Sequence, residues 1–138
     1  TLFIVFIISL VLGLLTPIGD IPYTYFIRTM QADTMEYIEE HIEEDLSLEK
    51  LATQFFVSKY HISHIFKDKT GLSIHQYITK KRLALCKEAI QGQMNISEAF
   101  QMVGFGDYSS FYRAFKKEFG ISPREYRNLI AENQQILI

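Results

Sequence analysis

Residues 104–127 read GFGDYSSFYRAFKKEFGISPREYR, a stretch in which aromatic rings are interspersed with five basic side chains. A buried core helix does not need these charges, and a disordered tail does not need these rings. The stretch therefore predicts a folded segment that buries some of its rings and presents its cations, with the remaining rings, to an anionic partner.

The sign of the charge changes along the chain. Residues 1–58 carry two basic side chains against nine acidic ones, whereas residues 59–127 carry twelve basic against six acidic. The formal net charge of -2 hides this contrast between an acidic and a cationic part. A length of 138 residues suits one domain or two very small ones, and the single cysteine, Cys86, excludes an internal disulfide.

The hydrophobic pattern from residue 33 onward has a helical period, and no segment alternates as a strand would. Residues suited to N-caps are followed three positions later by a carboxylate or an amide: Asp33 by Glu36, Ser73 by Gln76, Asn95 by Glu98 and Ser122 by Glu125. We expect an all-α fold of about seven helices. Their predicted bounds are residues 34–44, 48–54, 58–69, 74–91, 96–102, 108–119 and 123–132.

The chain contains an internal repeat with an offset of 49 residues. Residues 58–78 aligned with residues 107–127 share Phe66 with Phe115, Lys67 with Lys116, Gly71 with Gly120, Ser73 with Ser122, and Tyr77 with Tyr126. A short helical pattern and a turn precede each copy, and each glycine is expected to end its helix in a left-handed cap. Each half therefore predicts a helix, a turn and a second helix.

The second helix of each copy has an apolar inner face and a polar outer face. The inner faces carry Ile62, Ile65 and Phe66 in the first copy, and Phe111, Ala114 and Phe115 in the second. The outer faces carry Lys59, Tyr60, Ser63, His64 and Lys67 in the first copy, and Tyr108, Ser109, Tyr112, Arg113 and Lys116 in the second. Hydrogen-bonding groups that reach base edges, together with cations for phosphates, are what a helix in a major groove needs.

A continuous helix without Gly or Pro is predicted between the two copies, over residues 74–91. Its expected apolar contacts are Ile74, Tyr77, Ile78, Leu85 and Ile90, with Cys86 as a small core filler, while Lys80, Lys81, Arg82 and Lys87 supply charge. A helix of about eighteen residues spans about 27 Å, comparable with the ~34 Å between successive major-groove faces. Such a connector can direct two reading helices to neighbouring turns of a duplex.

The first nineteen residues carry no charge, and a helix of that length approaches the thickness of a bilayer's hydrocarbon core. Two interpretations stay open: a membrane tether, or a buried or dimer-forming helix of a larger upstream domain. Pro17, Gly19 and Pro22 predict a linker over residues 16–32. We expect residues 1–32 to be the remnant of an upstream part, residues 33–91 the first subdomain with the connecting helix, and residues 92–138 the second subdomain with a tail.

Three motifs lie within about residues 34–130: SLEKLA (47–52), SKYHISHIFKDKTGLSIHQYITKKRLALC (58–86) and VGFGDYSSFYRAFKKEFGISPREYR (103–127). With these motifs the chain resembles the C-terminal DNA-binding domain of AraC/XylS-type transcription regulators. The resemblance implies two helix-turn-helix subdomains joined by a helix, with residues 58–69 and 108–119 as recognition helices.

The resemblance places base-facing positions on Tyr60, Ser63 and His64 in the first recognition helix, and on Tyr108, Ser109, Tyr112 and Arg113 in the second. His64 stands where the family usually has Arg, which implies a weaker contact at neutral pH and sensitivity to pH. Ala99 and Phe100 reverse the family's usual order of a large aliphatic residue followed by Ala. This reversal implies altered packing of the second subdomain.

The sequence gives no support for an enzyme, a cofactor or a metal site. The acidic run at residues 36–45 has Met35, Ile38 and Ile42 at helical spacing, so we interpret it as the solvated face of a covering helix. His61 and His64 lie three residues apart but lack a third ligand. The chain also contains no recognisable phosphate loop, nucleophile motif or cofactor signature.

We therefore predict the sequence-specific double-stranded-DNA-binding domain of a bacterial, cytoplasmic transcription regulator. Its expected partners are promoter or operator DNA and RNA polymerase, with a homodimer formed through an upstream part. Two alternatives of other classes stay open: a membrane-tethered signalling regulator anchored by residues 1–19, and a helical protein-interaction module that does not bind DNA. His64 and the near-neutral total charge motivate the second alternative.

Overall fold

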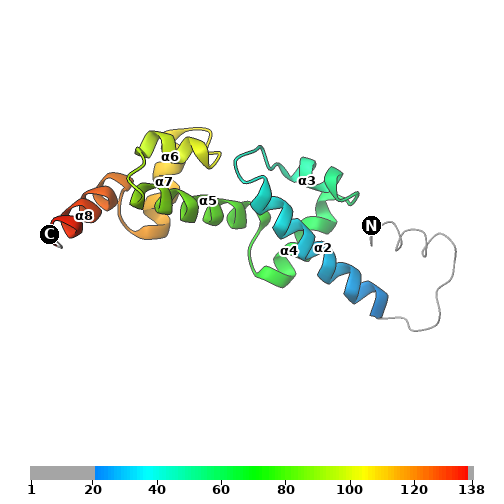
Figure 1. Cartoon of the computed structure of the whole chain (residues 1–138). Helices are drawn as coiled ribbons and strands as arrows, with labels where there is room; N and C mark the ends of the chain where they lie inside the picture. Colours follow the sequence, from blue (N-terminus) through cyan, green and yellow to red (C-terminus); the bar gives the residue numbers. More distant parts are fainter. Residues whose placement is uncertain (1–20, 137–138) are drawn as a thin grey trace.

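Seven helices and no strand make up residues 21–136, the part of the chain that this computed structural model describes. The helices are α2 (Ile21–Glu40), α3 (Leu48–Gln54), α4 (Lys59–Thr70), α5 (Ile74–Gln91), α6 (Ile96–Met102), α7 (Tyr108–Phe119) and α8 (Pro123–Ile136). They form two lobes joined by α5, with α2, α3 and α4 at one end and α6, α7 and α8 at the other (Figure 1). The expected all-α class is confirmed, and α3, α5, α6 and α7 have the predicted bounds.

The helix before the first repeat starts much earlier than predicted. α2 begins at Ile21, so the predicted linker over residues 16–32 is wrong for residues 21–32, while residues 16–20 lie outside the described part. Pro22 is compatible with this start because an N–H in the first helical turn has no intrahelical partner to lose. The predicted N-cap at Asp33 is also wrong, since this residue lies inside α2. Residues 1–19, on which the membrane alternative depends, are likewise outside the described part.

The first lobe has a core formed by α2, α3, α4 and the start of α5. Ile38, Leu51, Ile62 and Phe66 are at most 1% exposed. Burying a side chain of this size contributes about 1.5–3 kcal/mol to the free energy of folding. The first half of the acidic run, up to Glu40, thus lies on a helix that covers the core, with its carboxylates at the surface, as predicted. The predicted helix end at residue 44 is wrong, because residues 41–45 lie in the loop that follows α2.

The second lobe is centred on stacked aromatic rings from α6 and α7. Phe111 and Phe115 are fully buried, and the Phe100 ring stacks on Phe111 with 5.4 Å between centroids and 16° between planes. Ala99 is 0% exposed and Phe100 is 7% exposed, so both side chains of the reversed pair are inside the core. The ring stack is the physical means by which the lobe accommodates Phe at this position.

Polar caps set the starts of three helices at the predicted residues. Ser73 forms a complete capping box at the start of α5. Ser122 and Glu125 exchange the equivalent pair of bonds before α8, with N···O distances of 2.7 and 3.2 Å. Asn95 caps α6 by accepting the backbone N–H of Ser97 at 3.0 Å. These local hydrogen bonds explain why the helix starts could be predicted from sequence.

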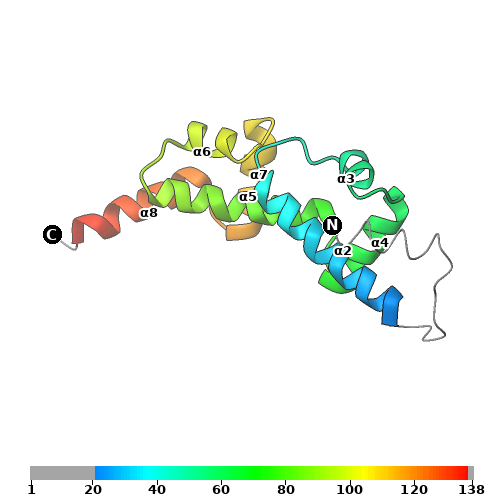
Figure 2. The same cartoon turned by 45° about the vertical axis from the view of Figure 1, so that its right-hand side comes forward.

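The connector α5 runs unbroken for 18 residues from one lobe to the other, as both views show (Figures 1 and 2). Its buried side chains are Ile74, Tyr77 and Ile78 toward the first core, and Leu83, Cys86 and Ile90 toward the second. The prediction of Leu85 as a core contact is wrong, because Leu85 is 39% exposed and Leu83 only 1%. Leu85 lies two helical turns beyond Ile78 on the stripe that faces the first lobe, but the second lobe packs on a different face of α5 and leaves Leu85 exposed.

Candidate nucleic-acid interface

The predicted outer face of α7 is accessible to solvent. Ser109, Arg113 and Lys116 are exposed, Tyr108 is 45% exposed, and Tyr112 is half-buried. On the opposite face the phenylalanines of the core fix the helix in the second lobe. One face of α7 is therefore anchored and the other is open to a partner.

A carboxylate organises the start of α7. Asp107 accepts the backbone N–H of Ser110 at 2.8 Å and the hydroxyl of the same residue at 2.7 Å. The backbone hydrogen bond, followed by the hydroxyl, holds the pKa of Asp107 below its ordinary value. Further along, Nε of Arg113 donates to the carbonyl oxygen of Ser109 at 3.3 Å. This contact holds the guanidinium close to the helix surface beside the tyrosines.

The two tyrosines of α7 form an aromatic rim beside Arg113. The rings of Tyr108 and Tyr112 lie 6.1 Å apart and are tilted by 45°. Tyr108 also contacts Phe100 edge-on, at 5.7 Å between centroids. The contact with Phe100 of the core thus restricts the conformations available to the Tyr108 ring at the surface.

The predicted outer face of α4 is also at the surface, but its chemistry differs. Tyr60 is 74% exposed, and its ring stacks on His64 at 5.6 Å with only 8° between the planes. Lys59 forms an ion pair with Glu49 of α3 at 2.7 Å. Lys67 is exposed and Ser63 is half-buried. The first face therefore has no arginine, and one of its two lysines already has an acidic partner.

The two motifs repeat each other in geometry as well as in sequence. α4 and α7 are both 12 residues long, with N-caps at Ser58 and Asp107. Gly71 and Gly120 end them in the left-handed conformation, at φ of 73° and 76°, as predicted. Figures 1 and 2 both show α3 and α6 on the same side of the connector. The repeat therefore forms two helix-turn-helix units on one helical support.

Comparison with known proteins identifies this arrangement. A family model described as a helix-turn-helix domain matches residues 51–129, which is more than half of the chain. The chain is also similar to a solved transcriptional regulator with an AraC-type DNA-binding domain from Chromobacterium violaceum, at 26% identity and a TM-score of 0.67. That match covers 75% of this chain and 94% of the other. The chain belongs to the AraC/XylS family.

Two relatives show how much of an AraC/XylS protein the chain represents. The multiple antibiotic resistance protein MarA of Salmonella typhimurium is 31% identical over 109 residues, which cover 75% of this chain and 84% of MarA. The protein LumQ of Photobacterium leiognathi is 36% identical over 95 residues, covering 68% of this chain. The same match covers 38% of LumQ, so the chain spans little more than a third of that relative's length.

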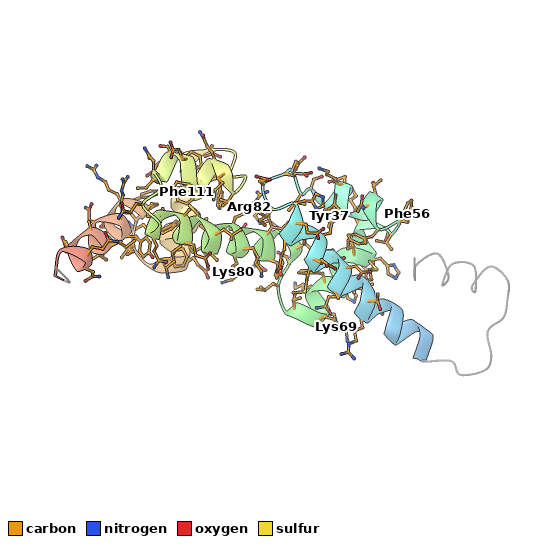
Figure 3. All side chains as sticks on the ribbon, viewed as in Figure 1. Tyr37, Phe56, Lys69, Lys80, Arg82 and Phe111 are labelled. Atoms are coloured by element: carbon orange, nitrogen blue, oxygen red, sulfur yellow. The ribbon has the colours of Figure 1, made fainter. Side chains whose placement is uncertain are left out.

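The cations on the connector of this AraC/XylS domain bind within the protein. Lys80 pairs with Glu118 of α7 at 2.6 Å, and Lys81 pairs with Glu39 of α2 at 2.5 Å. The ammonium group of Lys87 lies over two aromatic rings of the second lobe. Sequence reasoning found these charges but not their partners, because the acidic partners of the two lysine pairs are about forty residues away in the chain. These cations therefore link α5 to the lobes through contacts at the surface, and Figure 3 labels Lys80 on the connector.

Other kinds of site find little support within the described residues of the AraC/XylS domain. No group of three or more His, Cys, Asp or Glu in residues 21–136 could hold a metal ion. Across the same range, no helix is both long and apolar enough to cross a membrane. Cys86 is fully buried, and burial raises the pKa of its thiol to about 12, so it acts as the predicted core filler.

Sequence reasoning missed two residues that shape the interface. Asp107 caps α7, and an Asp immediately before an amphipathic segment is a recognisable N-cap signal. Glu49 neutralises Lys59 across the turn between α3 and α4. No local pattern predicts that pair, because the two residues lie ten positions apart and meet only after the turn has folded.

Proposed function

We propose that this chain is the sequence-specific double-stranded-DNA-binding domain of a bacterial transcription regulator, and that α4 and α7 enter adjacent segments of the major groove. The observation that carries the proposal is the pair of twelve-residue helices, each anchored by its inner face and exposed on its outer face, on one 18-residue connector. Membership of the AraC/XylS family and the AraC-type DNA-binding domain named for the Chromobacterium relative support it.

The outer face of α7 supplies most of the sequence readout in this proposal. Arg113 has the planar donor pair that matches the O6 and N7 acceptors of guanine. Tyr108, Ser109 and Tyr112 surround it with hydroxyl groups and apolar ring edges, which suit the remaining base edges and thymine methyl groups. Lys116 lies one turn further along the helix, where it can reach a phosphate.

The outer face of α4 makes a weaker and more apolar contact. Tyr60 and His64 present a stacked pair of rings, and Ser63 adds one hydroxyl group. Lys67 is positioned to bind a phosphate, whereas Lys59 must first leave Glu49. We therefore infer that the first motif contributes less affinity than the second.

The proposal extends to the place and the partners of the regulator. We propose that it acts in the cytoplasm, where the bacterial chromosome lies, and that bound DNA brings it close to RNA polymerase. A homodimer through an upstream part would double the number of base contacts. No catalytic step is part of this proposal.

Selection of bound duplexes from a random pool, followed by titration at several salt concentrations, tests the proposed function. We expect a two-part motif whose segments lie about 10.5 base pairs apart, and an affinity that falls steeply as salt rises. Lys116→Ala should weaken binding to selected and random duplexes alike and reduce the slope of log affinity against log salt by about one.

Lys50→Ala is the control, because Lys50 is an exposed lysine of α3 that lies off both outer faces and pairs with Glu44. This variant should keep the wild-type salt slope. Recovery of no common sequence, with equal binding to all duplexes, would count against sequence-specific recognition.

A further inference from the structure

The two lobes touch directly where the turn after α6 meets the loop after α2. Gly104 lies in that turn and Glu43 lies in that loop. A Cβ placed on Gly104 would lie 2.7 Å from the carbonyl oxygen of Glu43 and 2.9 Å from a guanidinium nitrogen of Arg82. The backbone of the second lobe therefore lies against the backbone of the first, with Arg82 beside both.

Arg82 fastens this loop to the connector. Its Nε donates to the carbonyl oxygen of Ile42 at 2.9 Å, and its Nη2 donates to the carbonyl oxygen of Glu44 at 2.6 Å. Both carbonyls follow the C-terminus of α2, where backbone acceptors lack helical partners and favour a cation. The side chain is half-buried, and Figure 3 shows it between α5 and the loop. A charged donor bound to two carbonyls is a strong and directional restraint.

A glycine is needed at position 104 because of the close contact with Glu43 and Arg82, and less because of the positive φ of the turn. Phe56 occupies the matching position of the first motif, the second residue after the helix, and has φ of 55°. The turn therefore accepts a side chain where space allows. Gly71 and Gly120 also have positive φ, yet a Cβ on either would meet nothing within 4 Å. Of the three positive-φ glycines in the described residues, Gly104 is the crowded one.

The contact between Gly104 and Glu43 lies beside residues 79–82 of α5, which belong to neither core. Ile78 is the last residue of α5 in the first core, and Leu83 is the first in the second core. A bend or twist between these positions would change the angle between the lobes without opening either core. The ion pairs of Lys80 and Lys81 lie in the same stretch, but their side chains are 36–50% exposed, and exposed pairs restrain geometry weakly.

We propose that Arg82, Gly104 and the backbone of residues 42–44 form a clasp that fixes the angle between α4 and α7 and thereby the spacing of the two DNA segments that the protein accepts. The last part of this inference rests on the proposed function. Because one base pair turns the duplex by about 34°, a modest change in the angle between the lobes is enough to move a recognition helix out of register. Arg82 is thus a positioning residue that need not touch DNA.

The first test measures the protein alone. Spin labels on Lys69→Cys and Lys117→Cys report the distance between the exposed ends of α4 and α7, while the buried Cys86 stays unlabelled. Arg82→Ala and Gly104→Ala should each broaden or shift the distance distribution. Gly120→Ala is the matched control, since it introduces the same substitution at positive φ without a clash and should leave the distribution unchanged.

The second test measures DNA spacing. Each protein is titrated with a selected duplex and with duplexes that have one base pair added or removed between the two segments. The wild type should lose at least about tenfold in affinity on either altered duplex, equivalent to about one or two mismatched base pairs. Arg82→Ala should bind the selected duplex more weakly than the wild type, but should lose less than about threefold on the altered ones. Thermal unfolding confirms that each variant is folded, and Arg82→Lys replaces Arg82→Ala if the latter does not fold.

The possible results distinguish a failure of the proposed clasp from a failure of the proposed function. Unchanged label distances in Arg82→Ala and Gly104→Ala would overturn the clasp, and so would a wild-type spacing penalty in Arg82→Ala. If the wild type prefers no duplex, the proposed function fails, while the label distances still decide whether the clasp holds the lobes.

Discussion

Arg113 and His64 occupy the same position of the repeat, yet they present opposite chemistry to solvent. The imidazole of His64 stacks on the ring of Tyr60, whereas Arg113 is exposed and donates from its Nε to a backbone carbonyl. A guanidinium offers two parallel donors and a permanent charge, and a neutral imidazole offers one donor. The second motif therefore offers more hydrogen-bond donors for reading a base sequence than the first.

Arg113→Ala should therefore cost about 1–3 kcal/mol of binding free energy at the selected site and relax the preference at one base pair. Fluorescence anisotropy with the selected duplex and with duplexes changed at each position measures both effects. Ser109→Ala is a useful comparison, since it leaves the carbonyl that holds Arg113 in place. An Arg113→Ala protein with undiminished preference at every position would contradict the assigned role.

The starts of α7 and α8 each contain a carboxylate whose pKa is lowered by hydrogen bonds in the folded chain. The pKa of Asp107 is lower in the folded chain because its carboxylate accepts the Ser110 N–H and hydroxyl. A carboxyl whose pKa is depressed on folding stabilises the fold above its unfolded pKa of about 3.9. This contribution is lost as the pH falls through the lower, folded pKa. Glu125 has a lowered pKa for the same kind of reason, through Ser122.

Asp107→Asn removes the ionisable group and keeps the N-cap, because Asn is also a good N-cap but cannot ionise. Between about pH 5 and pH 2 the melting temperature of the wild type should fall more than that of Asp107→Asn. Asp107→Ala should be less stable than either near neutral pH, since it removes the cap itself. Parallel pH profiles for the wild type and the Asn variant would show that the carboxylate charge is irrelevant to the stability of α7.

The face of α5 that packs on the second lobe can be tested with a neighbouring pair of leucines. Leu83 is 1% exposed and Leu85 is 39% exposed. Leu83→Ala should lower the free energy of unfolding by about 2–5 kcal/mol, as expected for a buried leucine. Leu85→Ala should lower it by less than about 1 kcal/mol. Urea denaturation of the two variants measures the difference, and equal losses would place both leucines in the core.

The helix ends that could be predicted from sequence are those fixed by hydrogen bonds between residues close together in the chain. Ser73 and Asn95 begin helices through hydrogen bonds to residues two or three positions away, so their signals are visible in the sequence. The start of α2 and the exposure of Leu85 depend on how the lobes pack, which no local pattern contains. All ten predicted site residues lie at least partly at the surface, but their contacts with DNA stay predictions.

Many of the basic side chains in the sequence already bind acceptor groups within the protein. Lys59, Lys80 and Lys81 pair with carboxylates, and Arg82 binds two carbonyls. The basic half of the chain is therefore less available to phosphates than its composition indicates. Of the predicted outer-face cations that pair with no carboxylate within residues 21–136, α4 carries Lys67 and α7 carries Arg113 and Lys116, so the electrostatic attraction to DNA should be stronger at the second lobe.

In the proposed complex with DNA, the ion pair of Glu49 with Lys59 keeps one cation of the first lobe from phosphates, and removing the charge of Glu49 should strengthen binding. Glu49→Gln releases Lys59 for a phosphate, so affinity for random duplex should rise by up to about fivefold and the salt slope should steepen by about one. Glu44→Gln is the control, because it removes the same charge and releases Lys50 of α3 instead. If both variants gain equally, the gain comes from net charge and not from Lys59. The double variant Glu49→Gln with Lys59→Ala should lose the gain, since the negative charge is still absent but the released cation is gone.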